Sequence, residues 1–539
     1  MVGDTDSLRH SIMRTGFARG LCGRKYSYCE SATAVHFSDL YRYVEPLCAS
    51  KDRKTDLAVA LSHYGYLYRT DPRGLPKNDN SNTDRERYGR LMSAPGGRST
   101  LDQKELEDIV SLVLKAAKEQ GVDQAEAAAS HDIGLSATAR LGSVESLEYT
   151  NDRGVGVTVY KDQKKGSAST SDFSPAALRE VVVKACSFAE YTAADEHSGL
   201  ADKELMASEI PDLDLMHEWD LQSADAIRIA IECEDAARSF DKRVTNSEGA
   251  TVSTSSGVRA YGNTHGFLAG HPKSSHSISC VVVGESNGDM ERDYWYSSTR
   301  DAGDLEAPQE IGETAARRTV QRLGSRKIKT DRAPVLFAPE VARGFIGHAI
   351  GALSGGAQYR RSSFLLNAAG EKIFPDFVQI QERPHIPKAM ASAPYDAEGV
   401  ATSDRGLVVD GVIQGYILSS YSARRLGLKT TANAGGAHNL LVPGGTDDME
   451  SLIKSMGRGL LVQELIGQGV NGVTGDYSRG AVGYWIENGE ILHPVHEITI
   501  AGNLKDLYQH IAAIGNDQDL RSGIRCGSLL VEAMTIAGA

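Results

Sequence analysis

The sequence lacks any long apolar run, since no stretch approaches the ~20 consecutive apolar residues that a membrane-spanning helix needs. The first residues, MVGDTDSLRHSIMRTG, contain acidic side chains and have no apolar signal core. We therefore expect a cytoplasmic chain that makes no contact with a membrane. Cysteine is also scarce: the chain has seven, an odd number, and no Cys-x-x-Cys pair. This pattern argues against a disulfide framework and against a thiolate zinc site.

Local catalytic motifs are absent as well. The dipeptide His-Glu occurs only at His217 and His496, and neither has the second histidine of a zinc-peptidase helix. His493 and His496 are three apart in GEILHPVHEITIAG, which alternates as a strand, so they should point to opposite faces. The glycines of Gly467–Gly472 match GxGxxG, but they follow a helical pattern and no helix comes after them, so we interpret them as loop glycines. There is no Walker loop.

The distribution of charge excludes one class of partner. The net charge is -13, but residues 1–98 carry 16 Lys and Arg against 11 Asp and Glu, whereas residues 99–539 carry 42 against 60. The main body is therefore strongly acidic and would repel the phosphates of nucleic acid. Small molecules, peptides or another protein remain as partners.

Residues 1–91 differ in character from the rest of the chain. They hold eight of the 21 tyrosines and three of the seven cysteines, with no sustained helical or strand period. Their last part, DPRGLPKNDNSNTDRERYGR, has the composition of a disordered segment. We predict a disordered tail, or a chain whose real start is Met92. A small accessory domain is the alternative.

Residues 99–330 predict an N-terminal α+β domain of helices and hairpins. A capping box at Thr100 and Gln103 opens a helix that Gly121 ends. The expected features that follow are a hairpin with Val155, Val157 and Val159 on one face and its turn at Lys165-Gly166, helices capped by Ser174-Pro175 and by Ser223, a hairpin turning at Asn287-Gly288, and a helix from Pro308 to Leu323 closed by Gly324.

Residues 331–539 predict a second domain that is rich in glycine and mainly β. It opens with a strand and a helix and continues with many short strands, interrupted by one further helix from Met449 to Leu465. The fold class we expect is therefore α+β with two domains, an N-terminal layer domain of helices and hairpins and a mainly β C-terminal domain.

The opening helix of the second domain, within GFIGHAIGALSGG, is unusual in its glycine content. Each glycine inside a helix costs ~1 kcal/mol relative to alanine, so a row of them needs a reason. Glycines at three- and four-residue spacing share one face and let another backbone approach closely, beside an apolar flank of Val341, Phe345, Ala349 and Ala352. His348 fits a packing role better than that of a lone ligand. We predict a docking surface formed by Gly344, Gly347, Gly351 and Gly355.

Several long segments give the chain a family likeness. From about residue 99 to 539 it resembles the TldD/PmbA family of bacterial peptidases, in its PmbA (TldE) branch. The segments that carry the resemblance are GFIGHAIGALSGGAQYRRSSFLL, SAPYDAEGV, SSYSARRLGLKTTANAGGAHN, TGDYSRGAVGYWIENGEILHPVHEITIAGNLKD and GIRCGSLL. They are long and occur in order along the chain, which makes the likeness specific.

The resemblance also implies where the catalytic side chains would stand. The TldD subunits of the family carry HExxxH on the matching helix, followed by Arg-Arg, with a cysteine near the C-terminus as a further metal ligand. Aligning that Arg-Arg with Arg360-Arg361 sets Gly347 and Ala352 in place of the two histidines and His348 in place of the glutamate. Cys526 matches the ligand cysteine but lacks its companions. We therefore expect no catalytic residue and no metal in this chain.

The family works as a pair, and this implies a heterodimer. A TldD-type partner would hold the zinc and hydrolyse unfolded or flexible peptides, while this chain would shape the substrate cavity. Such a metallopeptidase would be active only as the complex. The alternative is a non-catalytic peptide-binding protein, either alone or as a homodimer, which modulates an antitoxin or a gyrase inhibitor without hydrolysis. A cysteine hydrolase built on Cys526 with His438 or His493 has no local sign of an activated thiol.

Overall fold

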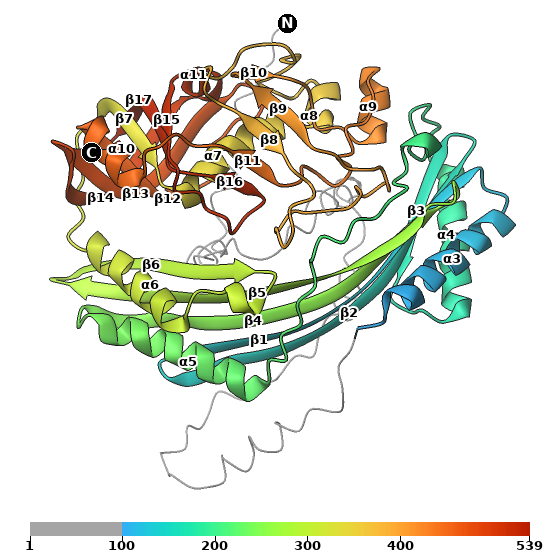
Figure 1. Cartoon of the computed structure of the whole chain (residues 1–539), viewed down its shortest axis with the longest axis horizontal. Helices are drawn as coiled ribbons and strands as arrows, with labels where there is room; N and C mark the ends of the chain where they lie inside the picture. Colours follow the sequence, from blue (N-terminus) through green and yellow to red (C-terminus); the bar gives the residue numbers. More distant parts are fainter. Residues whose placement is uncertain (1–99, 539) are drawn as a thin grey trace, which may run out of the picture. The chain divides into compact units, whose positions relative to one another are not determined.

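The structure is a computed structural model that describes residues 100–538. The predictions made for residues 1–91 fall outside the described residues. The α+β class predicted from the sequence is confirmed (Figure 1). Between residues 100 and 538, no helix is both long enough and apolar enough to cross a membrane.

The first six strands form one antiparallel sheet in the order β3-β2-β1-β4-β5-β6. Neighbours in the sheet are neighbours in sequence, except that β1 pairs with β4. The two hairpins predicted from the sequence are confirmed as β2–β3 and β5–β6. The strands are β1 (Gln124–Arg140), β2 (Ser143–Lys161), β3 (Lys164–Thr170), β4 (Val244–Asn263), β5 (Leu268–Ser286) and β6 (Asp289–Thr299).

Four helices cover one face of this sheet. They are α3 (Gln103–Glu119), α4 (Pro175–Tyr191), α5 (Ser223–Phe240) and α6 (Pro308–Arg322), and short 3-10 turns lie at Lys203–Leu205 and Ala302–Asp304. Ala125, Ala127 and Ala129 of β1 join the core of α3 and α4, and the later odd-numbered residues Ala137 and Ala139 join that of α5 and α6. Figure 1 shows the two helix pairs at opposite ends of the long strands. The even-numbered side chains of β1 therefore point to the helix-free face.

The turn of the first hairpin was predicted at the wrong place. The turn lies at Asp162 and Gln163, which both have positive φ, and not at Lys165-Gly166. Gly166 lies inside β3, where a Cβ would come within 2.0 Å of the Ala185 carbonyl oxygen of α4. This glycine therefore serves the close approach of a helix to the sheet, whereas the turn at Asn287-Gly288 is as predicted.

Two helix caps also differ from the sequence predictions. The capping box of α3 consists of Asp102 and Glu105 and not of Thr100 and Gln103. Ser174 caps α4 as predicted. Ser223 is the first residue of α5, and the N-cap position, Gln222, makes no side-chain capping bond.

The chain after residue 330 builds two further sheets. A six-stranded sheet has the order β14-β13-β12-β7-β17-β15 and a five-stranded sheet the order β10-β9-β8-β11-β16. The strands are β7 (Asp331–Phe337), β8 (Ile380–Glu382), β9 (Arg405–Val409), β10 (Val412–Ile413), β11 (Leu440–Val442), β12 (Gly459–Ile466), β13 (Asp476–Glu487), β14 (Glu490–Asn503), β15 (Ile511–Ile514), β16 (Ile524–Cys526) and β17 (Leu529–Ala537).

The helices of this part are short, and one of them was predicted too long. They are α7 (Pro339–Ala352), α8 (Gly355–Tyr359), α9 (Ser420–Leu426), α10 (Met449–Met456) and α11 (Leu504–Gln509). The predicted helix from Met449 to Leu465 ends at Met456, because Gly457 and Gly459 both have positive φ. Residues 459–465 of that stretch belong to β12. The glycines of Gly467–Gly472 therefore follow a strand, and not a helix as predicted. The element after them is the strand β13, so no helix follows them, as predicted.

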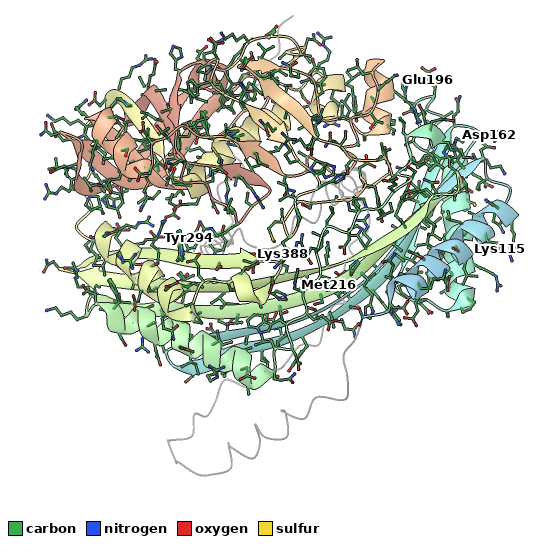
Figure 2. The ribbon with its side chains drawn as sticks, in the orientation of Figure 1. Lys115, Asp162, Glu196, Met216, Tyr294 and Lys388 are labelled. Atoms are coloured by element: carbon green, nitrogen blue, oxygen red, sulfur yellow. The ribbon has the colours of Figure 1, made fainter. Side chains whose placement is uncertain are left out.

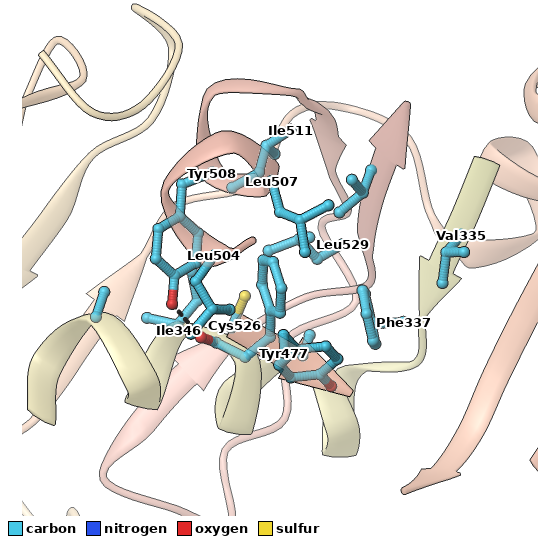
Figure 3. Close-up of a cluster of buried hydrophobic side chains, with 14 of the residues drawn as sticks. Val335, Phe337, Ile346, Tyr477, Leu504, Leu507, Tyr508, Ile511, Cys526 and Leu529 are labelled. Carbon is cyan, nitrogen blue, oxygen red and sulfur yellow. Dashed lines mark hydrogen bonds between the residues drawn. The ribbon is translucent and has the colours of Figure 1, made fainter. Parts of the chain in front are cut away.

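The large core of this part surrounds α7 (Figure 3). Phe345 of α7 stacks on Phe337 with ring centroids 5.0 Å apart and meets the edge of Tyr508 at 5.0 Å. The hydroxyl of Tyr508 donates a hydrogen bond of 2.8 Å to the Phe345 carbonyl oxygen. One face of α7 is thereby fixed in the core.

A network of buried charges joins α6 and β6 to α7 and β12. Asp293 of β6 is 1% exposed, and its Oδ2 lies 3.2 Å from both Arg318 Nε and Arg322 Nη1. Arg318 also reaches Glu340 of α7 at 2.7 Å, and Arg322 reaches Glu464 of β12 at 2.7 Å. Because these arginines are desolvated, their positions depend on the carboxylates around them.

A more exposed contact lies where the loop after β6 meets the segment before Tyr395. Lys388, labelled in Figure 2, donates to Asp301 at 2.7 Å and lies 3.5 Å from Asp304. The partly open surroundings of this pair make it weaker than the buried network, because solvent screens it.

Candidate functional site

The candidate site is the glycine-bearing helix α7, which follows β7. Pro339 lies in its first turn, where backbone N–H groups have no partner within the helix, so the missing N–H of proline costs no hydrogen bond. Val341, Phe345, Ala349 and Ala352 are all buried. The apolar flank predicted from the sequence is thus the core-facing side of the helix.

Three of the four predicted glycines lie together on the remaining side of α7. Gly344 and Gly351 are exposed, and a Cβ at either would find no described atom within 4 Å. A Cβ at Gly347 would meet only Ile524 Cδ1, at 3.7 Å. These glycines do not serve a close contact among residues 100–538, so the surface they form is open.

The fourth glycine does not belong to this surface. Gly355 is the first residue of α8, because α7 ends at Ala352 and Ser354 caps the next helix. A Cβ at Gly355 would lie 2.3 Å from Ser422 Oγ of α9. Gly355 therefore allows α8 to pack closely on α9, and the predicted four-residue face is reduced to Gly344, Gly347 and Gly351.

His348, between these glycines, is half-buried against an aromatic ring. Its ring meets Tyr477 edge-on with centroids 5.9 Å apart. Burial lowers the pKa of His348, and the nearby Arg479 lowers it further. The imidazole is therefore neutral at pH 7, and the contact is one of packing.

Cys526 is fully buried in β16, within the same core as α7 (Figure 3). Burial raises the pKa of its thiol to about 12. A nucleophilic cysteine needs the opposite shift, so the thiol stays protonated and unreactive. The cysteine-hydrolase alternative finds no support at this position.

The donors around α7 do not fit a zinc ion. Zinc sites use three or four Cys, His or carboxylate ligands at about 2.0–2.3 Å. Gly347 and Ala352 offer no donor, and the Cys526 thiol would have to lose its proton inside an apolar core. Among residues 100–538, no three His, Cys, Asp or Glu side chains come together as a metal site would require.

A cluster of arginine and aromatic side chains, which the sequence did not predict, contacts α7 through Arg343. Arg343 donates to the Tyr296 hydroxyl at 3.1 Å and lies 3.5 Å from Asp519. Arg521 pairs with Asp519 at 2.8 Å and lies over the Trp295 ring at 4.2 Å. The partners come from β6 and from the segment before β16, so no local spacing signals them.

Two of the segments that carry the family likeness stabilise the fold through buried carboxylates. In SAPYDAEGV, Asp396 accepts hydrogen bonds from the backbone N–H groups of Glu398, Val400 and Ala434, and burial raises its pKa to about 7. Next to it, Tyr395 donates to the Ala269 carbonyl oxygen at 2.9 Å. This loop is thereby fastened to β5.

The glycine-rich segment SSYSARRLGLKTTANAGGAHN is held by another buried carboxylate. Glu382, 2% exposed, accepts from Arg405 Nε at 2.6 Å and from Asn433 Nδ2 at 2.7 Å. His438 donates its backbone N–H to the same carboxylate at 2.8 Å. These contacts order the loops.

Three family profiles match the chain in order. They are the PmbA/TldA metallopeptidase domain 1 over residues 125–189, the central domain over residues 217–323 and the C-terminal domain over residues 330–538. Together they span more than half of the chain and nearly all of the described residues that form sheets.

Individual proteins agree with these profiles. Metalloprotease PmbA of Escherichia coli O157:H7 is 49% identical over 436 residues, covering 81% of this chain and 97% of that protein. The Metalloprotease PmbA homolog of Haemophilus influenzae is 45% identical over 437 residues, with coverage of 81% and 97%.

Solved structures share the architecture. The crystal structure of a putative modulator of DNA gyrase from Bacteroides thetaiotaomicron aligns with a TM-score of 0.77 at 28% identity, covering 81% of this chain and 99% of that one. The crystal structure of TldE from Thermococcus kodakarensis aligns with a TM-score of 0.68 at 21% identity, with coverage of 80% and 100%, and shows a common fold.

Proposed function

The chain belongs to the PmbA/TldD family of metallopeptidases, and we propose that it is the non-catalytic subunit of a two-subunit peptidase. The observation that carries this proposal is the composition of α7. In the register set by Arg360-Arg361, Gly347, His348 and Ala352 occupy the three motif positions. Gly347 and Ala352 have no side-chain donor, and the single imidazole of His348 cannot replace two histidine ligands and a glutamate base.

The open surface at Gly344, Gly347 and Gly351 supports an assembly role. Glycine weakens a helix, yet nothing among the described residues uses the space that these glycines leave. A TldD-type catalytic subunit is the partner we propose for this surface. That partner would hold the zinc, and the pair would enclose and hydrolyse unfolded or flexible peptides in the cytoplasm.

A second candidate function is peptide binding without hydrolysis. The open glycine surface would serve a second copy of this chain equally well, and one structural relative is described as a putative modulator of DNA gyrase. This function would include modulation of an antitoxin or a gyrase inhibitor. Its distinguishing property is that no partner would confer hydrolysis.

Co-expression with a TldD-type subunit tests the two candidates. We expect the chains to co-purify and the complex to hydrolyse an unfolded peptide. Activity should disappear on treatment with a chelator and on mutation of the partner's HExxxH. A chain that purifies as a homodimer in the presence of that subunit, with no hydrolysis, would favour the peptide-binding function.

Metal analysis of the isolated chain tests the non-catalytic assignment separately. We expect well below one zinc per chain by elemental analysis after dialysis against a weak chelator, and no cleavage of flexible peptides, because the donors around α7 do not form a site. Stoichiometric zinc would contradict the assignment, and Cys526→Ala would then show whether this thiol is a ligand.

A further inference from the structure

The helix-free face of the N-terminal sheet carries a group of cations that the proposed assembly does not use. Strand register places them side by side. Ser130 of β1 pairs with Arg259 of β4, which pairs with His271 of β5. In the adjacent row, Asp132 pairs with Gly257, which pairs with Lys273. Side chains of paired residues point to the same face, so both rows line one surface.

This surface is hollowed into a pocket of about 720 Å³. Arg259 and Lys273 line it, and Asp132 is the acidic side chain among its lining residues. Arg153, also a lining residue, donates from Nε to the Ser171 carbonyl oxygen at 3.2 Å. Gly257 makes room for that carboxylate, since a Cβ there would lie 2.0 Å from Asp132 Oδ1. In a chain whose residues 99–539 are strongly acidic, this pocket is a local region of positive charge.

The two central cations have Asp132 as a neighbour of opposite charge, which favours the charged form of Lys273, but neither cation is in an ion pair with it. Arg259 and Lys273 form no ion pair and no side-chain hydrogen bond with any other residue of the described range. Both are open to solvent in the pocket. The surrounding protein nevertheless removes part of the hydration of Lys273, which lowers its pKa, and the charge of Arg300 lowers it further. An anion that entered would be attracted more strongly than at an ordinary surface lysine.

A buried arginine and a histidine lie close to these cations. Arg300 is 8% exposed and donates to the carbonyl oxygens of Ser274 and Met390 at 2.6 and 2.7 Å, while its Nε has no partner among the described residues. His271 is held neutral, because burial and the cations around it lower its pKa to about 4. Its Nδ1 is also buried without a partner in the described part of the chain.

We propose that this pocket, lined by Arg259, Lys273 and Asp132, binds a carboxylate group of an extended peptide. The cations attract the carboxylate, and Asp132 accepts a hydrogen bond from a neighbouring N–H of the peptide backbone. A simple anion without a hydrogen-bond donor, such as sulfate, offers the Asp132 carboxylate only repulsion, whereas a peptide supplies both groups. That the ligand is a peptide rests on the proposed function. That its bound group is an anion rests on the charges that line the pocket.

Peptide carboxylates have two sources, the C-terminus and acidic side chains. Three unstructured peptides of equal length separate them: one free acid without Asp or Glu, the same peptide amidated at its C-terminus, and an amidated peptide with one internal Glu. Binding to the full chain, purified alone, is measured by calorimetry. Binding by the first peptide but not the second identifies the C-terminus, and binding by the third identifies the side chain.

Charge-neutral variants locate the binding. Lys273→Gln and Arg259→Gln should each weaken binding of the carboxylate-bearing peptide roughly tenfold or more, as expected for loss of a hydrogen bond to a charged group. Lys115→Gln is the matched control, because Lys115 is an exposed lysine of α3 that lies among the helices (Figure 2). Circular dichroism verifies that the variants fold.

Two results would overturn this inference. One is equal affinity for carboxylate-bearing peptides and the neutral peptide. The other is an equal effect of Lys115→Gln and Lys273→Gln. Neither depends on hydrolysis, so failure of the pocket is distinguishable from failure of the proposed function, which is read from co-purification and cleavage by the complex.

Discussion

Asp293→Ala is expected to lower the free energy of unfolding by about 3–5 kcal/mol, the cost of breaking a buried ion pair by removing one partner. Asp293 lies 3.2 Å from both Arg318 and Arg322, and the three side chains are nearly or fully buried. Without it, each guanidinium keeps only its outer carboxylates. The measurement is the shift of the urea unfolding transition, followed by circular dichroism.

Glu248→Ala is the matched control for this prediction. Glu248 pairs with Arg292 at 3.0 Å, but both side chains are about one third to one half exposed. A pair of this kind contributes about 0–1 kcal/mol. If Asp293→Ala destabilised the protein no more than Glu248→Ala, Glu340 and Glu464 would be sufficient for the two arginines, and the network would not depend on Asp293.

Gly351→Leu should weaken assembly with the proposed catalytic partner by roughly fivefold to more than a hundredfold. A Cβ at Gly351 meets nothing within 4 Å among the described residues, so the added side chain projects outward and disturbs no internal contact that the structure describes. At an interface the same side chain must be accommodated by the partner, and overpacking costs about 1–3 kcal/mol. Each 1.4 kcal/mol corresponds to roughly tenfold in affinity. The measurement is the dissociation constant of the complex.

Two further variants make this result specific. Gly351→Ala should have a milder effect, because alanine stabilises a helix by about 1 kcal/mol relative to glycine and offsets part of the lost contact. Gly415→Leu adds the same side chain at another glycine with open space around it, outside α7. A complex that tolerates Gly351→Leu as well as Gly415→Leu would show that the glycine surface of α7 is not the interface.

The sequence predicted those features that depend on neighbouring residues. The alternation of Val155, Val157 and Val159 and the Asn287-Gly288 turn are local, and both were placed correctly. Glycine proved ambiguous, because it is used both in turns and where elements approach closely. Gly166 and Gly355 belong to the second kind, and the contacts that require them come from Ala185 and Ser422.

The rest of the candidate site depends on contacts between distant residues. Arg343 meets Tyr296 and Asp519, which lie 47 and 176 residues away. Asp132, Arg259 and Lys273 come from three strands whose register is set by pairing along the whole sheet. Neither group forms a recognisable pattern in the sequence, so the three-dimensional structure was needed to find them.

Hydrolysis by the assembled complex with His348→Ala in this chain tests the central claim most directly. The proposed register aligns His348 with the glutamate of the family motif, but its neutral, half-buried ring packs against Tyr477. We therefore expect the variant complex to keep most of its activity on an unfolded peptide, while mutation of the partner's HExxxH removes it. If His348→Ala abolished hydrolysis while assembly and zinc content stayed intact, this chain would be part of the active site and the non-catalytic assignment would be wrong.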